Sequence, residues 1–154
     1  MHWHEHEAIL DVSADAAFAT LTNLEQLPEW NSIINAVTER PNHLEPGAEW
    51  VVQMHAMAQS WMSRSTVLEY RPAERYFRYR SCTDDGNPSW AEWTWTVSPV
   101  TDSHSRVNVS WVLNPQTFWR RMLLARIRAR QLRNGELPRS LSRLAEAATV
   151  VAER

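Results

Sequence analysis

Apolar and polar residues alternate along most of the chain up to about residue 113, and this pattern predicts a series of β-strands. In residues 49–57, for example, the even positions Trp50, Val52 and Met54 are apolar, and Glu49, Gln53 and His55 alternate with them. A period of two puts alternate side chains on opposite faces of a strand, so each predicted strand has one apolar face. The first strand is predicted over residues 2–12. Turn-forming residues separate six more strands, which span 33–39, 49–57, 61–71, 75–82, 89–98 and 105–113.

Two short helices are expected between the first and second strands. Residues 14–21 form a helical segment preceded by Ser13, whose hydroxyl can accept hydrogen bonds from the free N–H groups of the first turn. Residues 24–27 offer a second short turn of helix, which Pro28 is expected to close.

The alternation stops after residue 115, and helical spacing continues toward Ala152. This spacing predicts a long terminal helix that lies across the sheet and is bent or broken within 135–138. The whole pattern predicts one α+β domain over residues 1–154. The apolar stripe of the terminal helix consists of Leu137, Leu141, Leu144 and Ala148.

Nine tryptophans are an unusually high number for a chain of 154 residues. Trp93 and Trp95 share one face of their predicted strand, and Trp111 shares a face with Val109. Large rings line ligand cavities, whereas solid cores are built mainly from branched aliphatic residues. The composition therefore favours an apolar cavity between the sheet and the last helix. A core filled by bulky rings is the alternative.

Composition removes several kinds of chemistry. All 16 basic residues are arginine, so a Schiff base on a lysine side chain is excluded. A single cysteine, Cys82, excludes an intramolecular disulfide and a cysteine-rich zinc site. No long apolar run or secretion signal is present, so a cytoplasmic location is expected.

Five segments carry a resemblance to a known family. They are the apolar–Asp entry into the first helix at 10–18, the Pro-x-Trp segment at 23–30, the Pro-Gly turn at 46–48, the strand ending in proline at 67–72 and the helical segment at 137–144. Together they resemble the START/Bet v 1-like (SRPBCC) superfamily, specifically its polyketide cyclase/dehydrase type. The match departs at Ser13, where the family usually has proline.

The resemblance implies a helix-grip fold, in which a curved antiparallel seven-stranded sheet wraps around a long C-terminal helix, with two short helices after the first strand. It also implies a protein that binds a hydrophobic or aromatic small molecule in an internal cavity and promotes cyclisation and dehydration, with no cofactor. The alternative is a non-catalytic protein that binds, transports or sequesters such a ligand, for example in self-resistance. Fold alone does not decide between these functions.

Period-two parity assigns side chains to the cavity. Even positions are expected to face inward in 61–71, as are the odd positions of 75–82. The expected ligand-binding residues are Trp50, Val52, Met54, Thr66, Leu68, Phe77, Tyr79, Trp93, Trp95, Val109, Trp111, Trp119 and Leu123.

Three residues are candidates for catalysis. The same parity turns Arg64 into the cavity, where a guanidinium would orient an enolate oxygen, unless it pairs with a carboxylate near the mouth. Tyr70, like Tyr79, could donate a hydrogen bond to a carbonyl, or these rings could simply line the rim of the cavity. His6 on the apolar side of the first strand could move protons. Fraying of the chain start is the competing interpretation for His6. No metal site is expected.

Charge is divided unevenly between the two parts of the chain. Residues 1–113 carry 7 arginines against 15 acidic residues, whereas 114–154 carry 9 against 3. Six arginines between 120 and 133 alternate with apolar residues in an amphipathic basic helix. This helix could dock an acidic carrier protein, or it could be a solvated face. A nucleic acid partner is not expected, because the net charge is −2 and the aromatic residues are assigned to the inner face. Membrane contact is not expected either.

Overall fold

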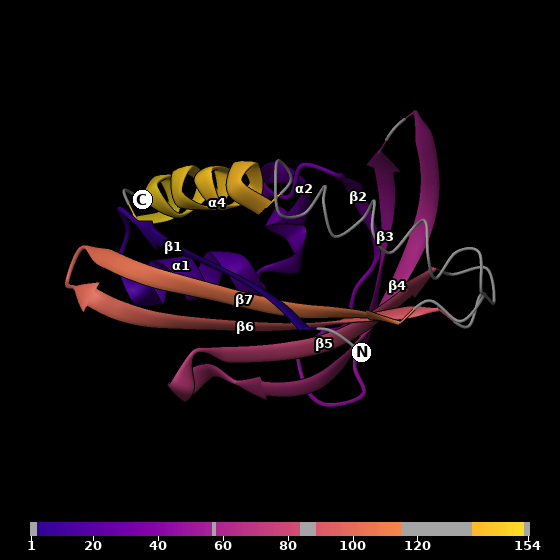
Figure 1. The fold of residues 1–154 in the computed structure, drawn as a ribbon, viewed down its shortest axis with the longest axis horizontal. Coiled ribbons are helices and arrows are strands. Elements are labelled where there is room, and N and C mark those ends of the chain that lie inside the picture. The colour runs from indigo at the N-terminus through magenta and orange to yellow at the C-terminus, as the bar shows by residue number, and fades with distance from the viewer. Residues whose placement is uncertain (1–2, 57, 84–88, 115–136, 153–154) are drawn as a thin grey trace.

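The computed structural model describes residues 3–56, 58–83, 89–114 and 137–152 (Figure 1). Seven strands and several helical segments follow one another in the predicted order. The strands are β1 (Trp3–Leu10), β2 (Ile34–Glu39), β3 (Glu49–Ala56), β4 (Gln59–Arg71), β5 (Tyr76–Thr83), β6 (Trp90–Thr101) and β7 (His104–Asn114). The helical segments are α1 (Ala14–Thr22), η1 (Leu24–Gln26), α2 (Leu27–Trp30), η2 (Pro72–Glu74) and α4 (Leu137–Ala152).

All seven strands form one antiparallel sheet in the order β1-β7-β6-β5-β4-β3-β2. Strands β2 to β7 form a meander, and β1 closes the sheet on the far side of β7. Helices α1, α2 and α4 lie over one face of this sheet, which we call the concave face (Figure 1). The predicted helix-grip architecture is confirmed.

The predicted cap at the start of α1 is also confirmed. The Ser13 hydroxyl accepts a hydrogen bond from the Ala16 N–H at 3.1 Å, which caps the helix as expected. Pro28, however, does not close the second helical turn. It lies in the first turn of α2, where the missing N–H of proline would have had no helical partner in any case.

A packed core lies where the helices cover the sheet. Leu141, Leu144 and Ala148 on α4 are buried, which confirms the predicted apolar stripe at these positions. They pack into the same cluster as Phe18 and Leu21 of α1. This part of the concave face is therefore filled by side chains.

The inward-facing residues of β4 differ from the prediction. Ser65 lies opposite Trp50, and Ser63 lies opposite Val52. Directly opposite residues share a face, and Trp50 and Val52 belong to the core, so the odd positions of this stretch face inward. Arg64 and the other even positions here face outward.

A β-bulge between Val67 and Glu69 then restores the predicted parity. Leu68 is the extra residue of the bulge and has no partner on β5. Beyond the bulge Tyr70 lies opposite Phe77 and packs against the core. The prediction for β4 was wrong before the bulge and correct after it, because an inserted residue exchanges the two faces.

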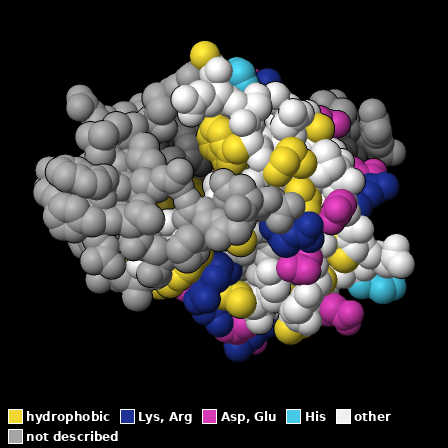
Figure 2. All heavy atoms as spheres, turned by 90° about the vertical axis from the view of Figure 1, so that its right-hand side faces the viewer, with side chains coloured by type: hydrophobic (Ala, Val, Ile, Leu, Met, Phe, Trp, Pro, Cys, Tyr) yellow, Lys and Arg dark blue, Asp and Glu magenta, His cyan; other side chains and the backbone are white. Residues whose placement is uncertain are grey.

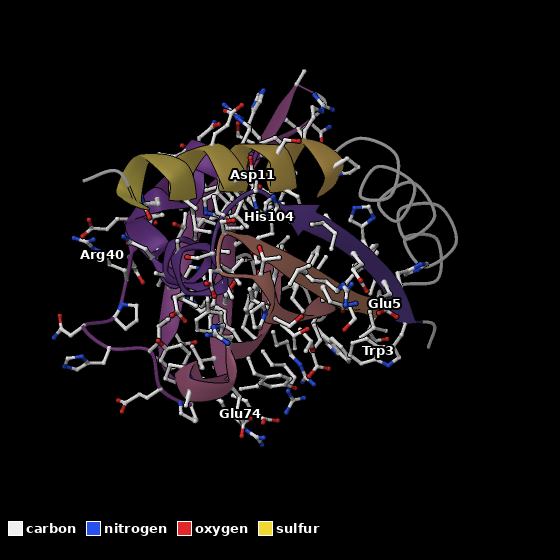
Figure 3. The ribbon with its side chains drawn as sticks, turned by 90° about the vertical axis from the view of Figure 1, so that its left-hand side faces the viewer. Trp3, Glu5, Asp11, Arg40, Glu74 and His104 are labelled. Atoms are coloured by element: carbon white, nitrogen blue, oxygen red, sulfur yellow. The ribbon has the colours of Figure 1, made fainter. Side chains whose placement is uncertain are left out.

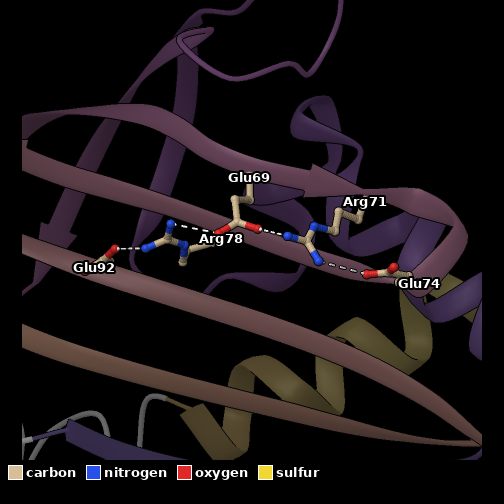
Figure 4. Close-up of polar contacts among 5 residues, drawn as sticks. All are labelled: Glu69, Arg71, Glu74, Arg78 and Glu92. Carbon is tan, nitrogen blue, oxygen red and sulfur yellow. Dashed lines mark hydrogen bonds and ion pairs between the residues drawn. The ribbon is translucent and has the colours of Figure 1, made fainter.

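The outer face of the sheet carries an alternating series of charges (Figure 4). Arg78 donates to Glu92 at 2.6 Å and to Glu69 at 2.8 Å. Arg71 continues the series with Glu69 at 2.7 Å and Glu74 at 3.3 Å. Opposite charges thus compensate one another on the outer face. Figure 2, which views the end of the molecule at the right of Figure 1, also shows basic and acidic side chains of the described residues next to one another.

Candidate functional site

Four aromatic side chains lie side by side across the concave face. The strand register aligns His4, Trp111, Trp93 and Tyr79 on β1, β7, β6 and β5. The ring centroids of His4 and Trp111 are 5.4 Å apart, and those of Trp111 and Trp93 are 5.8 Å apart, with 22° between the ring planes in both pairs. We call these four residues the aromatic row. The rings of His4, Trp111 and Trp93 form a stacked series, and aromatic surfaces of this kind bind planar ligands.

The aromatic row passes from the core to an accessible region. Trp111 is 1 % exposed, whereas His4, Trp93 and Tyr79 are partly exposed. The indole Nε1 of Trp111 is buried and has no hydrogen-bond partner in the described structure. Since buried donors are nearly always paired, this N–H is available to an acceptor on a ligand or to a water molecule.

Tyr79 supplies a second polar group in the row. Its hydroxyl oxygen accepts a hydrogen bond from Trp95 Nε1 at 3.3 Å. Burial raises the pKa of the Tyr79 hydroxyl to about 12, an effect that the hydrogen bond from Trp95 opposes. The hydroxyl therefore keeps its proton at neutral pH and can donate it to a carbonyl oxygen.

Three serines beside the aromatic row were missed by the sequence analysis. Ser63, Ser65 and Ser81 face inward on β4 and β5, and the hydroxyl oxygens of Ser65 and Ser81 are 2.6 Å apart. We call them the hydroxyl strip. The first two are 6 % and 3 % exposed. They alternate with polar residues, so only the pairing of β4 with the apolar positions of β3 could have placed them inside.

Several predicted ligand-binding residues instead build the core. Trp50, Val52, Phe77, Trp95 and Val109 are each no more than 3 % exposed. The ring of Trp50 lies 4.9 Å from that of Tyr79. Around these residues the packing matches the alternative expectation, in which bulky rings fill a core. Met54 is the predicted residue of β3 that stays partly exposed.

Arg64 does not face the concave side, contrary to the sequence expectation. Its guanidinium lies 3.3 Å from the Glu39 carboxylate and 4.0 Å from that of Glu49. Thr66 faces the same way and donates to Glu49 at 3.3 Å. A partly exposed ion pair avoids the cost of burying a guanidinium among tryptophans. Arg64 and Thr66 therefore belong to the outer face.

The other two catalytic candidates do lie on the concave side. The Tyr70 ring packs between Phe18, at 6.3 Å, and Phe77, at 5.8 Å. His6 lies opposite Val109 on β7, two residues from His4 on the same face of β1, and is partly exposed. The structure thus brings His6 close to the aromatic row and places Tyr70 within the packed core. Trp119, Leu123 and the arginines of 120–133 lie outside the described residues.

A shallow groove outside the sheet is a weaker candidate. It lies between the end of α1 and the segment that follows β2, and Asn23, Leu24 and His43 are among its lining residues. An ion pair joins Arg40, labelled in Figure 3, to Glu25 at its rim. Its volume of about 160 Å³ is below the usual range of small-molecule pockets. Among the described residues no group of three His, Cys, Asp or Glu side chains is placed to hold a metal ion.

Solved structures of similar fold include enzymes of aromatic ring formation. The chain superposes on the di-domain ARO/CYC BexL of the BE-7585A biosynthetic pathway with a TM-score of 0.77 and 17% identity, over 100% of this chain. It spans about half of that protein, 48% of its length. The Zhui aromatase/cyclase from a Streptomyces species matches with a TM-score of 0.66 and 16% identity, over 99% of this chain and 94% of that one.

A START superfamily protein from Mycobacterium smegmatis matches with a TM-score of 0.74 and 17% identity, over 96% of this chain and 99% of that one. At such identities these likenesses establish the fold. No curated protein matches the sequence. None of the described helices is long and apolar enough to cross a membrane.

The sequence profile of one family covers nearly the whole chain. Residues 1–149 match the family described as polyketide cyclase/dehydrase and lipid transport. The match agrees with the resemblance noted in the sequence and with the helix-grip topology of the sheet. This chain therefore belongs to the polyketide cyclase/dehydrase and lipid transport family.

Proposed function

We propose that the protein is a small-molecule cyclase of the aromatase/cyclase type, which holds a hydrophobic, oxygen-bearing substrate on the concave face beside the aromatic row. The observation that carries this proposal is the stacked series His4, Trp111 and Trp93, which ends at a partly exposed ring. Family membership supports ring closure as the reaction. We propose that the binding site and the catalytic residues belong to one domain. The proposed location of the protein is the cytoplasm.

Confinement supplies part of the rate enhancement. A flexible chain with several carbonyl groups closes a ring only when two of its carbons approach each other, and binding on a rigid surface removes much of that entropic cost. The aromatic row is rigid because Trp111 is buried between its neighbours and belongs to the core cluster. The aromatic row would therefore bind the substrate more tightly as its new ring forms and stacks on the row than as an extended chain.

Hydrogen-bond donors supply the second part. Tyr79 holds its proton and can donate to the carbonyl oxygen that becomes negative as the new carbon–carbon bond forms. The sequence suggested both Tyr70 and Tyr79 as such donors, and we assign the role to Tyr79 because the ring of Tyr70 is packed between Phe18 and Phe77. His6 or His4 would take one proton from the attacking carbon and pass it to the new alkoxide, then take the second proton of that carbon and give it to the departing hydroxide, which leaves as water.

The test is turnover of a synthetic linear poly-β-ketone carried as a small thioester. Such a compound closes slowly and to several products by itself, so the expected result is a faster reaction with one dominant cyclised and dehydrated product, followed by liquid chromatography and mass spectrometry. If the substrate is recovered unchanged but shields tryptophan fluorescence from an added quencher, the protein is instead a binding protein. No effect on rate, product or fluorescence would contradict both functions.

The arginine-rich segment 120–133 is proposed to dock an acidic carrier protein that delivers the substrate. The reason is charge: six arginines in that segment attract an acidic surface. Binding to a purified acyl carrier protein, measured by calorimetry, should weaken at least tenfold between 50 and 200 mM salt, by analogy with other multi-charge contacts. Reversal of Arg126 and Arg130 to Glu should abolish it, and the same change at the exposed Arg143 of α4 should not. Salt-independent binding would contradict this.

A further inference from the structure

Buried rings hold the side chain of Tyr79 in place. The ring centroids of Trp50 and Phe77 lie 4.9 Å and 5.1 Å from that of Tyr79, and both side chains are buried in the core. Trp95 is a third buried neighbour. It lies diagonally across the strand pair, because Trp95 is opposite Phe77 whereas Tyr79 is opposite Trp93. Aromatic side chains reach such a diagonal neighbour, so the position of the Tyr79 hydroxyl is set by packed rings.

The hydrogen bond from Trp95 also sets the direction of the Tyr79 proton. Trp95 Nε1 donates to the Tyr79 hydroxyl oxygen at 3.3 Å. The O–H of a phenol lies in the plane of its ring, because the oxygen is conjugated with the ring. The proton therefore has two places, related by a half turn about the C–O bond, and the N–H of Trp95 repels it from the nearer one. The Tyr79 hydroxyl accepts on the side of Trp95 and donates on the other side.

The side of Tyr79 away from Trp95 is the accessible one. Trp95 lies toward Phe77, which is buried. In the other direction along β5 the next inward-facing residue is Ser81, which is partly exposed. Trp93, opposite Tyr79, is also partly exposed. The proton of Tyr79 thus points out of the core, toward the part of the aromatic row where the substrate is proposed to lie.

We infer that Trp95 is a positioning residue, which turns the hydroxyl proton of Tyr79 toward a carbonyl oxygen of a substrate beside the aromatic row. This inference rests on the proposed function, in which Tyr79 is the hydrogen-bond donor. Trp95 is 3 % exposed, so it acts through Tyr79 rather than on the substrate itself. A hydroxyl that accepts one hydrogen bond also donates a stronger one, because linked hydrogen bonds polarise one another.

The first test is the kinetic effect of Trp95→Phe, which removes the N–H and keeps an aromatic ring. One hydrogen bond is lost, so kcat for the linear poly-β-ketone thioester should fall about threefold to tenfold, with little change in KM. Trp30→Phe is the matched control. Trp30 is equally buried, packs edge-on against Trp95 at 5.9 Å, and its Nε1 has no hydrogen-bond partner in the described structure. It loses the same ring area without a hydrogen bond, so kcat should stay within about twofold of the parent.

A double variant separates positioning from packing. Trp95→Phe combined with Tyr79→Phe should be no slower than Tyr79→Phe alone, because the hydroxyl through which Trp95 acts is already gone. Additive losses in the double variant would overturn the inference. Equal losses of kcat in Trp95→Phe and Trp30→Phe would also overturn it, since the effect would then be one of packing. Circular dichroism and urea unfolding verify that the variants are folded.

A spectroscopic test reports on the hydroxyl without turnover. With 3-fluorotyrosine in place of Tyr79, the fluorine lowers the pKa of the phenol, and its ¹⁹F NMR signal follows the titration. The hydrogen bond from Trp95 lowers the pKa of the Tyr79 hydroxyl, against the larger effect of burial. Trp95→Phe should therefore raise the pKa at position 79, and Trp30→Phe should leave it unchanged. A pKa that does not change in Trp95→Phe would overturn the inference.

The outcomes distinguish this inference from the proposed function. Ring closure by the parent protein with an unchanged kcat in Trp95→Phe would overturn the inference alone. No ring closure by the parent protein would contradict the proposed function and the inference with it.

Discussion

Replacement of Tyr79 with phenylalanine is expected to lower kcat for ring closure roughly 100-fold, the usual effect of removing one donor that stabilises a developing oxyanion. The ring of Tyr79 stays in the aromatic row in this variant, so KM should change little. The variant lacks the hydroxyl proton that Tyr79 donates. It also leaves Trp95 Nε1 without its hydrogen-bond acceptor. The measurement is single-turnover kinetics on the linear poly-β-ketone thioester.

A matched change on the other face controls for it. Tyr76 lies on the same strand but faces outward, where the Arg71 guanidinium lies 5.5 Å from its ring centroid. Tyr76→Phe should leave kcat within twofold of the parent, and an equal loss in both variants would show that Tyr79 acts only through stability. The parent enzyme should also keep its donor up to about pH 12, because burial raises the pKa of Tyr79 to about 12. An ordinary tyrosine would lose it near pH 10.

Replacement of Trp111 with alanine is expected to have the largest effect on stability. Trp111 is 1 % exposed and stacks on both His4 and Trp93, so its removal leaves a large cavity between these two rings. Truncations of buried tryptophan cost about 3–5 kcal/mol. The free energy of unfolding of a small domain is about 5–15 kcal/mol, so the variant should be marginally folded at best. Urea unfolding followed by circular dichroism measures the loss.

Trp3 gives the control for this substitution. It lies on β1 opposite Val112, is 50% exposed and is labelled in Figure 3. Trp3→Ala should cost less than about 1 kcal/mol, as expected for a side chain that is already half in water. Trp111→Phe should lose less than Trp111→Ala, because the indole N–H makes no hydrogen bond in the described structure and only ring area is removed. Similar losses for Trp3→Ala and Trp111→Ala would contradict the packing described for Trp111.

The order of the elements and the face of β3 could be predicted because the sequence contrasts strongly there. Trp50 and Val52 lie between the polar residues Glu49 and Gln53, and both are buried as expected. Residues 63–66 of β4 contain no such contrast, since serine, arginine and threonine follow one another. The face of this segment is decided by its pairing with β3, and the bulge near Leu68 then reverses the parity. Neither feature is visible in the pattern of one strand alone.

The candidate site was predicted in part for a related reason. The sequence placed Trp93 and Trp111 on inward faces, and both are members of the aromatic row. That they lie exactly opposite each other depends on the register of β6 against β7, which the turn between the strands sets. The role of Tyr79 depends on its burial and on the hydrogen bond from Trp95, which are properties of the folded molecule.

The pairing of β1 with β7 makes the site a late product of folding. Most strand pairs of this sheet join segments that are neighbours in the sequence, so they can form early. Glu5 and Asn108, by contrast, are 103 positions apart and join the chain start to β7. Closing so long a loop costs entropy that only completed packing repays. The histidines of β1 therefore reach the tryptophans last. Most of the chain must leave the ribosome before the protein can bind a ligand at the aromatic row.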